Sequence, residues 1–344
     1  MTSQEPLVLG LDVGGTASRA VVVTVAGRLV GQGRSGGGNP TSQPPEVAAA
    51  TVATAVATAL SGVDPGAVRA GVMGIAGGRR LADPRVAAVF ERSWREAGLC
   101  CPMDVVGDVL VAYVSATAEP SGSVLIAGTG AVAARIEDRT MVQLADGLGW
   151  LLGDEGSGVW LGRVAAREVV RALYAGRPPG PLVRLVAARL LDARRIPDAQ
   201  LLPDAQLLPD DLAVLAQAIV TEVYRQPPTA IAALAPLVSE AAAVEDPMAR
   251  EIVSRAVDKL TGTLAQVRDA GADTPIVLGG SVLASPGPIQ DAARRAVAQH
   301  WDAPVLTATT GVVGAAWLAA RTAVALDERD AAALHDRLRA VLRP

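Results

Sequence analysis

The sequence has very few of the residues that most often handle phosphates and protons: one lysine, Lys259, and two histidines, His300 and His335. Lys259 is far from any glycine-rich turn, so the chain has neither a G-x-x-x-x-G-K-[ST] phosphate loop nor a kinase-type strand lysine. Neither histidine is near a glycine turn or a nucleophile, which argues against a Ser-His-Asp triad and a histidine metal site. Bound phosphate would depend on backbone amides, hydroxyls and a metal ion, and a general base would be a carboxylate.

Cysteine and aromatic residues are also scarce. The two cysteines, Cys100 and Cys101, are adjacent and give no metal or iron–sulfur spacing. Because a disulfide between neighbours is strained, we expect free thiols in a reducing cytoplasm. Half of the residues are apolar but only nine are aromatic (five Trp, three Tyr and one Phe), so the core must consist mainly of Ala, Val and Leu.

The chain also lacks a basic block and a long apolar run. Its net charge is −4, from 31 basic and 35 acidic residues, which does not favour nucleic acid as a partner. No apolar run is long enough to span a bilayer, and the first is interrupted at Asp12. We therefore expect no membrane anchor, no signal peptide and a cytoplasmic protein.

The order of the predicted elements repeats along the chain. Strands at 7–13, 19–25 and 29–33 form an antiparallel meander, and helix, strand, helix, strand and helix follow. The series of strand, glycine turn and two further strands begins again at residue 123 and ends at 144. This recurrence predicts an α/β fold with two related halves that face each other.

The length of 344 residues also predicts two domains. We place the first at 1–117, completed by the C-terminal helix 326–344, and the second at 118–325 with a helical insertion. Residues 178–210 are expected to be irregular and contain the tandem copy D-A-Q-L-L-P, which ends at 209. Two copies are too few for a solenoid, so a duplication within a surface loop is the simpler interpretation.

The first turn of the chain, D-V-G-G-T at 12–16, predicts a phosphate loop. Gly14 and Gly15 permit positive φ and let the backbone approach a ligand closely, and Thr16 adds a hydroxyl. Asp12 ends a buried strand, where a carboxylate is costly without a charged or metal partner. A polyphosphate with Mg²⁺, which Asp12 would reach directly or through water, satisfies all of these groups. An ordinary hairpin remains the alternative.

Three further strand ends lead into small residues: Gly128-Thr129-Gly130, Gly279-Gly280-Ser281 and the turn at 311–316. Each alone is typical of a turn or of close helix packing. Together with the first turn they indicate a nucleotide held between two domains. Thr16 and Thr129 would donate to phosphates, and the turn at 279–281 would offer bare backbone to adenosine.

Asp108 follows a predicted strand at the entry to a helix. One interpretation is an N-cap, which contributes ~1 kcal/mol. The other is a general base that takes a proton from a substrate hydroxyl. Residue chemistry leaves the two interpretations even.

The segment 146–158 contains five glycines in thirteen residues. Asp154 and Glu155 are candidates to bind polyol hydroxyls, and Trp150 would line an apolar sugar face or fill the core. A capped turn before the next helix is the alternative. Asn39, after three glycines, is either a further hydroxyl-binding residue or a turn residue.

In these motifs the chain resembles the N-acetylglucosamine kinase branch of the actin/hexokinase/Hsp70 superfamily, the group that also includes the BadF/BadG-type ATPases. The shared motifs cover nearly the whole chain in order: 12–16, 37–40, 74–78, 107–108, 126–130, 153–158 and 278–281. The resemblance implies two RNase H-like, actin-like ATPase lobes with ATP and Mg²⁺ in the cleft between them. It also implies transfer of the γ-phosphoryl group to the 6-hydroxyl of N-acetylglucosamine or glucosamine, and a homodimer.

By position, the resemblance implies that Asp108 is the catalytic aspartate. The sugar contacts would come from Asn39, Asp108, Gly147, Leu148, Gly149 and Asp154. The ATP contacts would come from Gly14, Gly15, Thr16, Gly128, Thr129, Gly130, Gly279, Gly280 and Ser281, with Asp12 at the metal.

The chain departs from the family pattern at three places. Leu148 stands where a tryptophan is usual, with the tryptophan displaced to Trp150, and Ala76 and Thr41 replace a serine and an aromatic residue of the animal enzymes. These changes leave the N-acetyl preference open, with N-acetylmuramic acid or another sugar as alternatives. An ATPase activase would need cysteine spacing that Cys100 and Cys101 do not give, and a non-catalytic sugar sensor is a further alternative.

Overall fold

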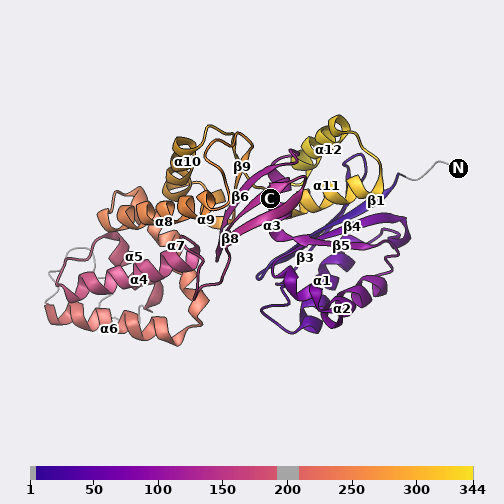
Figure 1. The fold of residues 1–344 in the computed structure, drawn as a ribbon. Coiled ribbons are helices and arrows are strands. Elements are labelled where there is room, and N and C mark those ends of the chain that lie inside the picture. Colours follow the sequence, from indigo (N-terminus) through magenta and orange to yellow (C-terminus); the bar gives the residue numbers. More distant parts are fainter. Residues whose placement is uncertain (1–4, 192–208, 344) are drawn as a thin grey trace. The chain divides into compact units, whose positions relative to one another are not determined.

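The structure is a computed structural model that describes residues 5–191 and 209–343 (Figure 1). Contacts divide the chain into two units. The first comprises Met1–Val124, Ile136–Val142 and Leu306–Pro344, and the second Leu125–Arg135 and Gln143–Val305. Each unit is described separately below.

The first unit is built on a five-stranded sheet with the strand order β3-β2-β1-β4-β5. β1 (Leu7–Val13), β2 (Ser18–Thr24) and β3 (Leu29–Ser35) form the expected antiparallel meander. β4 (Val68–Ile75) pairs in parallel with β1, and β5 (Met103–Gly107) in parallel with β4. The carboxyl ends of β1, β4 and β5 therefore share one edge of the sheet.

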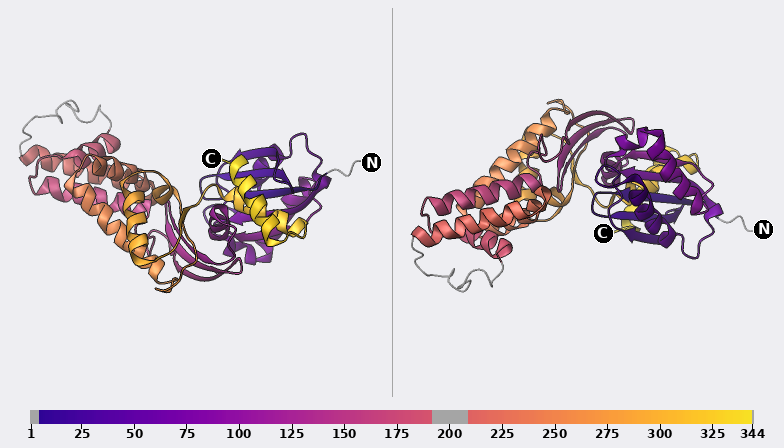
Figure 2. Two further views of the ribbon diagram at one scale, coloured as in Figure 1. Left: turned by 90° about the horizontal axis from the view of Figure 1, so that it is seen from above. Right: turned by 90° about the horizontal axis from the view of Figure 1, so that it is seen from below.

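Helices cover both faces of this sheet. Alternate β1 residues, Leu9, Leu11 and Val13, pack in one cluster with α1 (Pro45–Ala59) and α2 (Pro84–Glu96). On the other face Gly10 lies against α11 (Gly311–Ala323), which also packs on α3 (Asp108–Ala116) and α12 (Glu328–Val341). Figure 2 shows α11 and α12, at the yellow end of the colour scale, beside the indigo strands. The expected boundaries placed residues 306–325 with the second half, whereas α11 packs on β1. Short 3₁₀ turns lie at Pro65–Ala67 and Gly78–Ala82.

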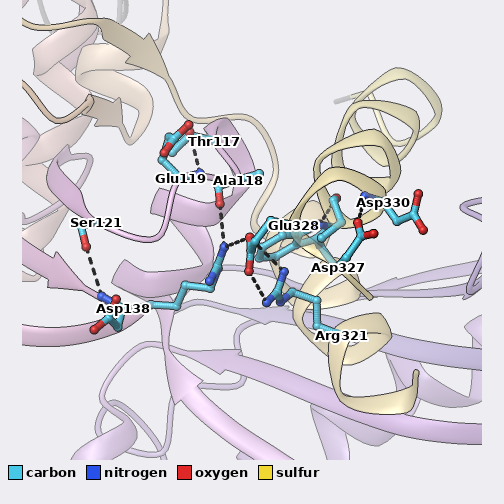
Figure 3. A network of polar contacts seen from close by, with 12 residues as sticks. Thr117, Ala118, Glu119, Ser121, Asp138, Arg321, Asp327, Glu328 and Asp330 are labelled. Atoms are coloured by element: carbon cyan, nitrogen blue, oxygen red, sulfur yellow. Dashed lines mark hydrogen bonds and ion pairs between the residues drawn. The ribbon is translucent and has the colours of Figure 1, made fainter. Parts of the chain in front are cut away.

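A polar network holds the turn after β7 (Ala131–Glu137) to α12 (Figure 3). Arg139 donates to Glu328 Oε2 at 2.7 Å and to the Ala118 carbonyl at 3.1 Å, and Arg321 donates to Glu328 Oε1 at 2.9 Å. Both guanidinium groups also lie over the Trp317 ring, about 5 Å from its centroid. The buried indole of Trp317, one of the few aromatic side chains of the protein, thus binds two guanidinium groups through cation–π contacts.

The second sheet has the strand order β10-β9-β6-β7-β8. Its strands are β6 (Gly122–Ala127), β7 (Ala131–Glu137), β8 (Thr140–Asp146), β9 (Ile276–Gly279) and β10 (Val305–Thr307). The helices of the second unit are α4 (Gly158–Tyr174), α5 (Pro181–Leu190), α6 (Pro209–Arg225), α7 (Ala235–Ala243), α8 (Pro247–Ala265), α9 (Ser281–Ala284) and α10 (Pro288–His300), with a 3₁₀ segment at Pro228–Leu234. Their core is mostly Ala, Val, Leu and Ile, with Trp160 and Trp301 as its aromatic members.

Most predicted elements are confirmed, but the expectation for 178–210 is wrong. The segment 178–210 was expected to be irregular, but it contains α5. Pro181 starts this helix, and Leu182, Val183, Val186 and Ala187 form its buried stripe. The tandem copy lies outside the described residues except for Pro209.

Cys100 and Cys101 are free thiols, as expected. Among the described helices none combines the length and the apolarity that crossing a bilayer requires.

The contact between Gly10 and α11 gives a stability test. A Cβ on Gly10 would lie 2.8 Å from the Cα of Ala316. Because this neighbour is the backbone of a packed helix, it cannot move aside as a flexible side chain would. We expect Gly10→Ala to lower the free energy of unfolding by about 1–3 kcal/mol, measured by chemical denaturation. Gly107→Ala is the matched control, because φ is −66° there and no atom lies within 4 Å of the added carbon. Equal stability of the two variants would contradict the packing described.

Candidate functional site

The turn after β1 presents exposed backbone and a hydroxyl. Gly14 N donates to the Ala17 carbonyl at 2.9 Å, and Gly38 N donates to the Gly14 carbonyl at 3.1 Å. Gly15 and Thr16 are exposed at the tip. Neither Gly14 nor Gly15 has a positive φ, so the conformational reason given for these glycines is wrong. Close packing explains part of the pattern, because a Cβ on Gly37 would lie 2.6 Å from the carbonyl carbon of Gly15.

Asp12 occupies the end of β1 on the face that α11 covers. The Gly311 N–H, at the start of α11, donates to its carboxylate, and Arg19 Nη1 lies 3.8 Å from its Oδ2. Burial nevertheless raises the pKa of Asp12, although Arg19 and the Gly311 N–H both act to lower it. The charged partner that the sequence argument required is present, and it does not fully compensate the desolvation.

Asp108 lies at the first position of α3, after the N-cap Gly107. The N-cap interpretation is therefore wrong in detail: Asp108 Oδ1 accepts from the N–H of the next residue, Val109, at 3.0 Å. Burial raises the pKa of Asp108, and the negative charge of Asp12 raises it further. The first unit thus holds two neighbouring carboxylates that are both costly to ionise.

Asn39 takes part in a turn close to this edge of the sheet. Its Oδ1 accepts from the Thr41 N–H at 2.7 Å, which is the turn role that the sequence left open. A Cβ on Gly77, where φ is +70°, would lie 2.6 Å from the same oxygen. The Asn39 amide is therefore next to the residues that follow β4.

A cavity of about 600 Å³ lies in the first unit beside Asp12. It is lined by Asp12, Arg19, Ala20, Val21, Gln32, Gly33, Arg34, Thr58, Thr309, Thr310, Val312, Leu342 and Arg343. Thr310 Oγ1 is buried there without a hydrogen-bond partner among the described residues. The cavity therefore combines arginines with an unused hydroxyl, a lining suited to anionic oxygens.

The sequence argument missed Arg19 and Arg34, because no glycine–lysine motif marks them. The strand register could have found them. Arg19 is directly opposite Asp12 on β2, and Arg34 is directly opposite Arg19 on β3, so all three share one face of the sheet.

In the second unit, the turn between β6 and β7 rests on the start of α4. Gly158 N donates to the Gly128 carbonyl at 2.7 Å, and Val159 N donates to the Thr129 carbonyl at 3.2 Å, while Thr129 itself is exposed. A Cβ on Gly128 would lie 3.8 Å from Ser281 Oγ. The structure therefore brings together two of the predicted ATP-binding turns, 128–130 and 279–281.

These two turns border a second cavity, of about 320 Å³. Its lining is Gly128, Thr129, Gly158, Leu161, Ala232, Ala235, Pro236, Ser239, Ser281, Val282, Ser285, Pro286, Gly287, Ile289 and Gln290. Gly280, at φ +79°, packs against the end of β6, where a Cβ would lie 2.9 Å from Gly128 N. A glycine is required at this position, and the backbone stays close to the cavity.

The acidic residues of 146–158 mainly support the backbone. Asp146 accepts from the N–H groups of Asp154 and Glu155 at 2.7 and 2.8 Å. Asp154 is 8% exposed, and its Oδ1 accepts from Ala131 N at 3.0 Å. Burial raises the pKa of Asp154, and the charge of Asp146 raises it further. Glu155 pairs with Lys259 at 3.0 Å.

The apolar side chains of the same loop are exposed. Leu148, Leu151 and Leu152 are 65%, 71% and 77% exposed, and Trp150 is 38% exposed. Trp150 therefore does not fill the core, which was one of its two expected roles. Gly147 and Gly149 both adopt positive φ.

The residues of the first unit fit Mg²⁺ in the way that nucleotide sites usually hold it. The described residues contain no group of three or more His, Cys, Asp or Glu side chains that could hold a metal. Mg²⁺ in phosphoryl-transfer sites is bound through one or two carboxylates together with phosphates and water. Asp12, whose ionised form is under-compensated, fits one such carboxylate.

The model of the BadF/BadG/BcrA/BcrD ATPase family matches residues 9–319. The chain belongs to this family. Comparison with curated proteins found no significant match. A candidate N-acetylglucosamine kinase from Chromobacterium violaceum is 24% identical, with a TM-score of 0.68 over 91% of this chain and 99% of that one.

Two further solved structures have a fold similar to that of the chain. A candidate N-acetylglucosamine kinase from Porphyromonas gingivalis is 20% identical, with a TM-score of 0.61 over 92% of this chain and 100% of that one. A ROK family glucokinase from Streptomyces griseus is 21% identical, with a TM-score of 0.55 over 92% and 99%. These likenesses confirm the predicted fold class of two actin-like ATPase lobes.

The raised pKa of Asp108 predicts how its removal changes stability. Because this pKa is above its ordinary value of 3.8 in the folded state, the folded state binds more protons than the unfolded state between the two values. The ionised carboxylate therefore costs stability at neutral pH. We expect Asp108→Asn to raise the melting temperature at pH 7 and to lose this advantage below about pH 4.

The control for this measurement is Asp83→Asn, at an exposed N-cap where Arg85 lowers the pKa of the carboxyl group. This variant should bring no rise in melting temperature at pH 7. A lower melting temperature for Asp108→Asn at pH 7 would contradict the electrostatic account.

Proposed function

We propose that the chain is an ATP-dependent amino-sugar kinase that transfers the γ-phosphoryl group to the 6-hydroxyl of N-acetylglucosamine or glucosamine. The observation that carries this proposal is the pair Asp12 and Asp108, two neighbouring carboxylates with raised pKa at the edge of the first sheet. Family membership supports the use of ATP, and the sugar kinases among the similar structures support the acceptor class.

Asp108 is proposed as the general base. A carboxylate with a raised pKa is a stronger proton acceptor than an ordinary one. Phosphoryl transfer needs mainly an oriented hydroxyl and compensation of the charge on the phosphate oxygens. Asp108 would orient the sugar hydroxyl and accept its proton, and the Asn39 amide and the loop at 147–149 would bind other hydroxyls.

The anionic part of ATP is proposed to contact backbone and cations. Thr16 and the N–H groups of Gly15 and Thr16 would bind phosphate oxygens, with Gly14 closing the turn through its bond to Ala17. Thr129 and the turn at 128–130 would bind phosphate oxygens in the same way. Arg19 adds a guanidinium next to Asp12, so the absence of a phosphate-loop lysine does not leave the site without a fixed cation. Mg²⁺, held through Asp12, would neutralise charge on the phosphates.

Asp154 remains a proposed sugar contact, although one of its carboxylate oxygens already accepts a hydrogen bond from the backbone. Its Oδ1 already accepts from Ala131 N, so Oδ2 is the oxygen proposed to accept from a sugar hydroxyl. The same bond places Asp154 directly behind the 128–130 turn. Changes at Asp154 are therefore expected to affect the binding of both substrates.

A substrate screen tests the proposal. ADP release would be measured with glucosamine, N-acetylglucosamine, N-acetylmuramic acid, N-acetylmannosamine and glucose, and NMR of the product would show which hydroxyl carries phosphate. Turnover of either of the first two to a 6-phosphate is the expected result. Turnover of N-acetylmuramic acid alone would change the acceptor, and no turnover on any sugar would favour a sensor.

Substitution of the proposed base is the second test. We expect Asp108→Asn to lower kcat for the sugar by about 10²–10⁴-fold, because the amide cannot accept the proton, while ADP binding measured by calorimetry stays within about twofold. Asp104→Asn, at an exposed position on the same strand β5, should retain activity. Full turnover by Asp108→Asn would refute the assignment.

A further inference from the structure

The second cavity contains one polar side chain whose hydrogen-bonding direction is fixed. Gln290, on the first turn of α10, donates from Nε2 to the Ala284 carbonyl at 3.1 Å and lines the cavity. A carbonyl only accepts, so the opposite orientation of the amide would set two acceptors against each other. Oε1 and the second N–H of the amide remain available.

The other polar side chains of this lining are hydroxyls: Thr129, Ser239, Ser281 and Ser285. A hydroxyl rotates to donate or to accept, so it does not distinguish an amino group from a carbonyl at the same position of a base. An amide held at one end does make this distinction. Selectivity among bases in this cavity must therefore depend mainly on Gln290.

The cavity is lined by two glycine-containing turns and by further polar side chains. The turns at 128–130 and 279–281 lie together in this lining, where Gly128 is next to Ser281. Ser239, Ser285 and Gln290 supply the rest of the polar lining. If the 128–130 turn binds phosphate and adenosine lies on the 279–281 turn, the heterocycle of the nucleotide reaches toward Gln290. A volume of about 320 Å³ falls within the range of small-molecule sites, about 300–1,000 Å³.

We propose that Gln290 selects a 6-aminopurine in this cavity, which makes the enzyme specific for ATP over GTP. A glutamine amide pairs with adenine through two bonds: its oxygen accepts from the 6-amino group and its N–H donates to the adjacent ring nitrogen. Guanine and hypoxanthine carry an oxygen at position 6, which would face Oε1 with no proton between them. The proposal rests on the proposed function, since it assumes that this cavity binds the nucleotide.

The test measures binding of ADP, GDP and IDP to the full chain by calorimetry, without any sugar. ADP should bind at least about tenfold more tightly than GDP or IDP, the effect of about one good hydrogen bond and one avoided repulsion. Purine riboside 5′-diphosphate, which has no group at position 6, should bind about tenfold less tightly than ADP. This last comparison uses the unaltered protein and does not depend on the folding of a variant.

Two variants complete the experiment. Gln290→Ala should weaken ADP about tenfold and reduce the preference for ADP over GDP to about twofold or less. Gln299→Ala is the matched control, because Gln299 is exposed on the same helix and does not line the cavity. It should leave both affinities unchanged.

The outcomes separate this inference from the proposed function. Tight and equal binding of ADP, GDP and IDP would refute the role of Gln290 while leaving the kinase proposal intact. The same holds if Gln290→Ala keeps the full preference for ADP. If no nucleotide binds, both proposals fail.

Discussion

The half-buried carboxylate of Asp12 is the constraint on which the first unit depends. α11 begins at Gly311 directly against it, and a Cβ at Gly311 would lie 2.7 Å from the carboxyl carbon. The helix start and Arg19 both favour the ionised form, yet the pKa is raised, so desolvation outweighs them. Asp108 adds a second carboxylate with the same deficit. Both ionised carboxylates cost folding stability, and pKa shifts produced by burial together with a neighbouring charge are most frequent at functional sites.

The small side chains that dominate the core, with few aromatic residues among them, allow the close packing that positions α11 against Asp12. Backbones approach each other closely where one partner is glycine: Gly10 meets Ala316 of α11, and Gly33 lies so close to α1 that a Cβ would be 2.8 Å from Ala59 N. Such contacts tolerate little displacement, because interiors are close-packed. The start of α11, and with it the N–H that reaches Asp12, is therefore fixed by the packing of glycine on alanine. Larger side chains would move the helix away from the carboxylate.

The parts of the fold that follow from local pattern could be predicted. Strand alternation gave the opening meander and its recurrence at residue 123, and Asp12 could be located because a charge at a strand end is unusual. α5 was missed because its apolar stripe is short and lies next to a repeat rich in proline. Arg19 and Arg34 were missed because their role comes from register across three strands. The positive φ at Asp146 and Asp154 has no local signal, since either residue is common in ordinary turns.

In the loop at 146–154, the same acidic side chains stabilise the backbone and are candidates for ligand contacts. Asp146 and Asp154 both adopt the left-handed conformation, which is costly for a residue with a side chain. The cost is offset by hydrogen bonds: Asp146 accepts two backbone N–H groups of the same loop, and Asp154 accepts the N–H of Ala131 at the start of β7. A loop held by its own acids keeps a defined shape while its leucines remain exposed. Because the bond to Ala131 also fixes the end of the 128–130 turn, the geometry of that turn depends on the same strained residue. The acidic residues of this glycine-rich segment therefore stabilise the backbone of the loop. Any contact that they make with a ligand depends on the loop shape that these hydrogen bonds maintain.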